Sequence, residues 1–129
     1  MVERIVRRSF LFRGLVKRFI AGDTIPEAMA VAEELHSRGF LISLDLLGES
    51  VASEAEALTA KAAYIEMLEA ISASPCKTST NISIKLTQCG LDQSEEFARH
   101  NYFEVLQKAK ELENFVRVDM EASNYTEKT

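Results

Sequence analysis

The sequence is poor in cysteine, proline and glycine: its 129 residues include two cysteines, two prolines and five glycines. No run rich in proline or glycine interrupts it and 47% of the residues are hydrophobic, a composition typical of a globular rather than a disordered chain. Cys76 and Cys89 form neither a CxxC pair nor a cluster with histidine, which argues against a metal site and favours a reducing compartment. A glycine-rich phosphate loop is also absent.

Long apolar runs and a basic surface are missing as well. No apolar run reaches the roughly 18 residues that predict a transmembrane helix. The net charge of −5 argues against a nucleic-acid partner. Positive charge gathers in residues 2–20, which predict a helix kinked near Gly14. We interpret this segment as a helix that packs on the domain with its arginines in water, and a membrane-surface or targeting helix is the alternative.

Three runs with alternating apolar and polar residues predict β-strands, over residues 41–50, 82–90 and 115–123. In each run a charged residue stands in the polar set, and these residues are Asp45, Lys85 and Asp119. Alternation of this kind places the aliphatic side chains on one face of a strand and the charged ones on the other. An apolar face that meets helices and a polar face that converges with its neighbours are typical of the interior of an enzyme barrel near its catalytic end.

The spacing of the charged residues, 40 and then 34 positions, leaves room for a helix between consecutive strands, as parallel strands require. A capping box at Ser53 opens a predicted helix over residues 53–74. A second helix is expected to begin at Asp92 or Ser94 and to end near Asn114. The sequence therefore predicts an α/β fold of the order β-α-β-α-β.

Upstream of the first strand the chain is predicted to be helical. Thr24 and Glu27 form a second capping box, and Gly39 ends the helix that it opens. We therefore divide the chain into N-terminal helices, residues 1–39, and the first three βα units of a (β/α)8 TIM-like barrel, residues 40–129. Because such a barrel takes about 250 residues, the chain is expected to be a truncated N-terminal part of a larger protein. A complete small three-stranded α/β domain is the alternative.

Four blocks of this sequence resemble the bacterial monofunctional proline dehydrogenases. They are residues 19–24 (FIAGDT), 44–49 (LDLLGE), 83–91 (SIKLTQCGL) and 114–121 (NFVRVDME), with Tyr125 and Thr126 beyond. One block alone is a short barrel-strand pattern of limited specificity. Four blocks in order and at suitable spacing, over essentially the whole chain, are strong evidence for the family.

The resemblance implies a distorted barrel and a flavoenzyme that oxidises L-proline to 1-pyrroline-5-carboxylate, in proline catabolism to glutamate, with FAD as cofactor and a quinone as electron acceptor. It implies that Lys85 binds the substrate, that Asp119 is a catalytic aspartate and that the backbone of Met120 contacts FAD. A cytoplasmic location follows, with peripheral association at the inner membrane as an option. The family's paired arginines for the proline carboxylate belong to later strands and the last helix, so this chain by itself is expected to be inactive.

The residues themselves leave alternatives open. An inward-facing Lys85 and Asp119 would be costly unless they are paired or used, so a buried structural ion pair is the alternative to a catalytic site. Asp45, Glu49 and Arg117 are expected to form a supporting network at the barrel mouth. Two other functions remain: a barrel enzyme in which Lys85 forms a Schiff base, and a non-catalytic α/β module that acts only as a partner.

Overall fold

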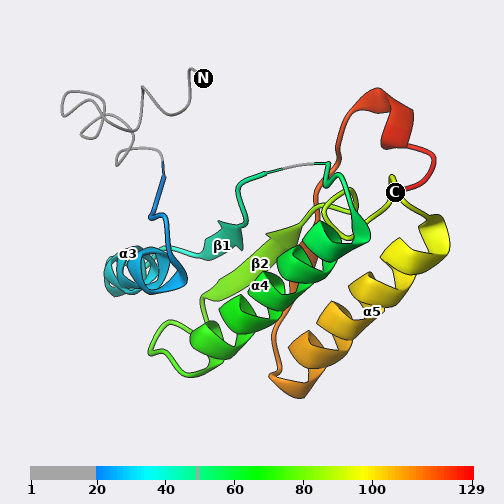
Figure 1. Ribbon diagram of the computed structural model, residues 1–129. Coiled ribbons are helices and arrows are strands. Elements are labelled where there is room, and N and C mark those ends of the chain that lie inside the picture. Colours follow the sequence, from blue (N-terminus) through cyan, green and yellow to red (C-terminus); the bar gives the residue numbers. More distant parts are fainter. Residues whose placement is uncertain (1–19, 49) are drawn as a thin grey trace.

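The structure is a computed structural model, which describes residues 20–48 and 50–129 (Figure 1). Its elements follow in the order α3 (Ile25–Ser37), β1 (Ile42–Asp45), α4 (Glu54–Ser72), β2 (Thr80–Ile84), α5 (Glu95–Glu111), β3 (Val116–Val118) and a short 3-10 helix, Ser123–Tyr125. The predicted β-α-β-α-β order is confirmed. Glu49 and all but the last residue of the helix predicted over residues 2–20 lie outside the described residues. The division of the chain after residue 39 stays a prediction.

Each of the three α-helices within the described residues begins at a side-chain cap. The hydroxyl oxygens of Thr24, Ser53 and Ser94 each accept a hydrogen bond from the backbone N–H three residues later, over 3.4, 3.3 and 3.0 Å. Such a cap stabilises a helix by about 1 kcal/mol because it satisfies a donor that the first turn leaves free. Of the two residues predicted as the start of α5, the structure selects Ser94.

The three strands form one parallel sheet in the order β1-β2-β3. In its register Asp45 lies opposite Ser83, and Ile84 lies opposite Val118. The crossover helices α4 and α5 contact each other and lie side by side over one face of the sheet, and α3 contacts β1 and α4 (Figure 1). Parallel strands with helical crossovers on one side are the arrangement found in α/β barrels.

The strands are shorter than the alternation predicts, since β1 ends at Asp45, β2 at Ile84 and β3 at Val118. After β2 the backbone turns back on itself: the carbonyl of Lys85 accepts hydrogen bonds from Gln88 N and Cys89 N, over 3.1 and 3.3 Å. These local bonds replace the ladder to a neighbouring strand. Lys85 and Asp119 therefore lie directly after their strands, at the carboxyl end of the sheet.

The hydrophobic core fills the space between the sheet and the helices. Its largest fully buried apolar side chains are Tyr64, Leu68 and Ile71 of α4, Ile82 and Ile84 of β2, and Val105 of α5. The opposite face of the sheet is polar, as the alternation predicts. We call it the polar face, and it consists of Ser43, Asp45, Asn81, Ser83, Lys85, Arg117 and Asp119.

Candidate active site

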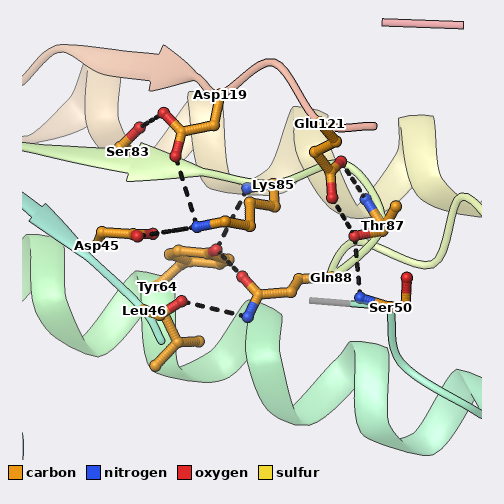
Figure 2. Close-up of polar contacts among 10 residues, drawn as sticks. All are labelled: Asp45, Leu46, Ser50, Tyr64, Ser83, Lys85, Thr87, Gln88, Asp119 and Glu121. Atoms are coloured by element: carbon orange, nitrogen blue, oxygen red, sulfur yellow. Dashed lines mark hydrogen bonds and ion pairs between the residues drawn. The ribbon is translucent and has the colours of Figure 1, made fainter. Parts of the chain in front are cut away.

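Lys85 lies between two carboxylates on the polar face (Figure 2). Its Nζ is 2.8 Å from both carboxylate oxygens of Asp45 and 3.5 Å from Oδ2 of Asp119. The other oxygen of Asp119 accepts a hydrogen bond from the hydroxyl of Ser83. The structure thus brings together two residues predicted for the site, Lys85 and Asp119, with Asp45 from the predicted supporting network.

The register of the sheet explains this convergence. Asp119 N donates to the carbonyl of Ile84 over 2.9 Å, so the residues that follow β2 and β3 stay side by side. Asp45 is paired with Ser83, two residues before Lys85 and on the same face. Three residues that lie far apart in the sequence therefore meet at the carboxyl end of a parallel sheet, where the ligands of α/β proteins bind.

The cluster is partly open to solvent: 17% of the Lys85 side chain is exposed, against 42% of Asp45 and 39% of Asp119. Burial by itself lowers the pKa of Lys85, but the hydrogen bond and charge of Asp45, followed by those of Asp119, outweigh it and raise this pKa above its ordinary value. Lys85 is therefore a fixed cation at neutral pH.

A second set of hydrogen bonds supports the site from below (Figure 2). The fully buried Tyr64 donates its hydroxyl to Oε1 of Gln88 and accepts a hydrogen bond from the backbone N–H of Lys85 over 3.4 Å. Nε2 of Gln88 donates to the carbonyl of Leu46 over 3.3 Å. Burial raises the pKa of Tyr64, so its hydroxyl remains a donor. The sequence does not reveal this role, because a tyrosine at helical spacing indicates a core residue.

Glu121 binds the loop that follows Lys85. Its carboxylate accepts hydrogen bonds from the hydroxyl of Thr87 and, over 3.0 Å, from Thr87 N. The same hydroxyl accepts from Ser50 N over 3.0 Å. The buried Thr87 thus links the chain after β1 to the chain after β3, a link that no local sequence pattern predicts.

Met120 follows Asp119 directly, and 64% of it is exposed. No hydrogen bond joins its backbone N–H to any residue within 20–48 and 50–129. Arg117 is exposed on the polar face and forms no ion pair within the described part of the chain.

A hollow of about 470 Å³ opens beside β1. Residues 20–25 and Ala28 line it together with Asp45, whereas Lys85 and Asp119 do not. Among the residues that the structure describes, no three histidine, cysteine or acidic side chains are grouped as a metal site would require. The charged cluster, rather than this hollow, therefore brings the reactive side chains together.

Comparison with known proteins identifies the family of this chain. The sequence profile of the family described as proline dehydrogenase matches residues 28–129. This chain belongs to the proline dehydrogenase family. The match covers β1, β2 and β3 and includes Lys85, Asp119 and Met120.

Curated relatives agree with this assignment. Proline dehydrogenase 1 of Bacillus subtilis is 36% identical over 113 residues, which are 88% of this chain and 37% of the relative. A proline dehydrogenase of Deinococcus radiodurans is 31% identical over 121 residues, 93% of this chain and 38% of the relative. The chain thus spans somewhat more than a third of the length of these family members.

A solved structure confirms the fold class. Proline utilization A (PutA) from Bdellovibrio bacteriovorus, in a crystal structure of the protein inactivated by N-propargylglycine, superimposes with a TM-score of 0.81 at 23% identity. The match covers 91% of this chain and 14% of that chain. The predicted α/β fold, with the first βα units of a TIM-like barrel, is therefore correct.

Proposed function

We propose that this member of the proline dehydrogenase family takes part in the oxidation of L-proline to 1-pyrroline-5-carboxylate, with FAD as cofactor and a quinone as the final electron acceptor. One observation carries the proposal. In a chain of this family, a lysine held as a cation lies between two carboxylates at the carboxyl ends of three parallel strands. This arrangement suits a small zwitterionic substrate, which carries one group of each charge.

In the proposed reaction the side chains orient the substrate and balance its charges. Lys85 donates a hydrogen bond from Nζ to the substrate carboxylate. Asp119, oriented by Ser83, faces the ring nitrogen. After this nitrogen has released one proton to solvent, Asp119 stabilises the positive charge that forms there again as the hydride leaves and the C=N bond forms. When bound, FAD would supply the chemistry that accepts the hydride from the ring carbon next to nitrogen. The protein thus contributes position and electrostatics.

The residues for the cofactor are proposed because the flavin ring of FAD is flat and largely apolar with a polar edge, and the exposed thioether and backbone N–H of Met120 offer one contact of each kind. The backbone N–H and side chain of Met120 and the ammonium of Lys85 would lie against the flavin ring. The exposed apolar surface of Met120 favours contact with a flat aromatic system.

A Schiff-base enzyme is the alternative for Lys85, and its pKa argues against it. Such a lysine must lose its proton to attack a carbonyl, and catalysis of this kind uses lysines whose pKa is lowered. Asp45 and Asp119 raise the pKa of Lys85 instead. Borohydride should therefore trap no adduct between a keto acid and Lys85. A non-catalytic α/β module remains the other alternative.

We further propose a cytoplasmic protein that meets the inner membrane peripherally in order to deliver electrons to a quinone. Within residues 20–48 and 50–129, no helix combines the length and the apolar character needed to cross a bilayer. Transfer to a quinone analogue in the presence and absence of vesicles of anionic lipid tests the membrane part of this proposal.

The test of the proposed function uses the protein as its gene encodes it. It should purify with flavin, and L-proline added without oxygen should bleach the absorption of the oxidised flavin and yield 1-pyrroline-5-carboxylate, which o-aminobenzaldehyde detects. D-proline is the matched control, and a proline analogue with an intact carboxylate and a ring oxygen should compete. A folded, colourless protein that takes up no FAD would end this proposal.

A further inference from the structure

The two carboxylates of the cluster hold Lys85 unequally. Both oxygens of Asp45 lie 2.8 Å from Nζ, whereas the nearest oxygen of Asp119 lies at 3.5 Å. The remaining oxygen of Asp119 is engaged by Ser83. Asp45 is therefore the main partner of the ammonium group, although Asp119 is the carboxylate that resemblance to the family assigns to catalysis.

Asp45 is well suited to hold a flexible side chain in place. It is the last residue of β1, its backbone is fixed by pairing with Ser83, and the next carbonyl, that of Leu46, accepts a hydrogen bond from Gln88. A lysine has four rotatable bonds and is held in one geometry only by its partners. A carboxylate on a strand end supplies such an anchor across the sheet.

The net charge of the cluster limits how Lys85 can bind a substrate carboxylate. The formal charges of Lys85, Asp45 and Asp119 sum to −1 at neutral pH, so the cluster as a whole does not attract a carboxylate. An ammonium group has three N–H donors, of which Asp45 and Asp119 together engage at least two. At most one N–H therefore remains for a substrate. Its direction depends on where Asp45 holds the nitrogen.

We propose that Asp45 is the positioning residue for Lys85 in the proline oxidation proposed above: it fixes the place and charge of the ammonium group and does not itself contact the substrate. The inference rests on the proposed function. Without the charge of Asp45, Lys85 moves toward Asp119 and its N–H no longer meets the substrate carboxylate in the reactive geometry. The net charge of the cluster rises to zero, so binding of an anionic group does not weaken.

The experiment is the substitution Asp45→Asn in the protein as its gene encodes it. We expect kcat for L-proline to fall by about 10- to 100-fold, as misplacement of a reacting group by about 1 Å does, while KM does not rise. The alkaline limb of the pH–rate profile should move to lower pH, because Asp45 contributes most to raising the pKa of Lys85. Asp45→Glu, which keeps the charge, should restore most of kcat.

Asp92→Asn is the matched control, because it makes the same chemical change at an exposed carboxylate that accepts a hydrogen bond from Tyr125. It should leave kcat and the pH profile unchanged. An Asp45→Asn variant with wild-type kcat, or one whose only defect is a higher KM, would overturn the inference, since Asp45 would then be dispensable or would bind the substrate.

A measurement without turnover keeps this inference separate from the proposed function. Titration of the Lys85 ammonium by NMR, assigned through Lys85→Arg, should give a raised pKa in the wild type and a lower one in Asp45→Asn. An ordinary pKa in the wild type would refute the pairing even if Asp45→Asn did not fold. Absence of proline oxidation together with a raised pKa would refute the proposed function and leave the pairing intact.

Discussion

Replacing Tyr64 by phenylalanine tests the hydrogen bonds beneath the site with little change in shape. The hydroxyl of Tyr64 is its only polar side-chain group, and the residue is fully buried. Tyr64→Phe leaves Oε1 of Gln88 without its donor, and 4% of Gln88 is exposed, so water replaces that donor poorly. The bond from Lys85 N, at 3.4 Å, is long and adds little.

The expected loss follows from these contacts. A hydrogen bond contributes about 1 kcal/mol net, and a buried acceptor left without a partner costs up to about 3 kcal/mol. We therefore expect Tyr64→Phe to lower the free energy of unfolding by about 2 kcal/mol, measured by urea denaturation with a shared m-value.

Tyr102→Phe is the matched control. Tyr102 is half-buried on α5, and its hydroxyl has no hydrogen-bond partner in the described part of the chain. Removal of this hydroxyl should cost less than about 0.5 kcal/mol. If Tyr64→Phe cost no more than Tyr102→Phe, the hydroxyl of Tyr64 would not hold the loop after β2, and the supporting role assigned to it would be wrong.

Two further predictions concern Lys85 and Cys89. Lys85→Ala should lower kcat/KM for L-proline by an amount that corresponds to a loss of about 2–4 kcal/mol of transition-state stabilisation, while circular dichroism shows that the fold is retained. Unchanged kinetics in a folded variant would remove Lys85 from the site. Burial, together with the charge of Glu121, raises the pKa of Cys89 to about 12. The Cys89 thiol therefore keeps its proton in the folded state, whereas in the unfolded state it loses this proton from about pH 8.5 upward. The free energy of unfolding should therefore fall as pH rises above about 8.5, and Cys89→Ala should remove this part of the loss; an identical pH dependence in the variant would contradict it.

Local features of the fold could be predicted because they depend on neighbours in the sequence. The caps at Thr24 and Ser53 satisfy donors three residues away, so the sequence around them is sufficient to place the start of a helix. The strand ends were predicted too far along the chain. The alternation of apolar and polar residues continues past Ile84, but the backbone there forms the hydrogen bonds of a turn instead of those of a strand. A pattern of side chains does not reveal which of these backbone hydrogen bonds form.

Charge alternation was enough to place Asp45, Lys85 and Asp119 on one face of the sheet, since the side chains of a strand alternate between its two sides. It could not rank the two carboxylates. The sequence offered an ion pair of Lys85 with Asp119 only as the alternative to a catalytic role. In the structure Asp45 lies closer to Lys85 than Asp119 does, because β1 is paired with β2 so that Asp45 falls opposite Ser83. Such an offset between strands is set by the packing of the whole sheet.

The sequence by itself therefore determined the family, the order of helices and strands, and the residues able to carry charge to the polar face, because each of these depends on residue types and short spacings. Only the tertiary structure decided which of these residues meet. The hydroxyl of Tyr64 lies under Lys85 and Glu121 binds Thr87 because sheet register and helix packing bring their elements within hydrogen-bond distance. Contacts between residues so far apart in the sequence depend on packing in three dimensions, which local pattern does not encode.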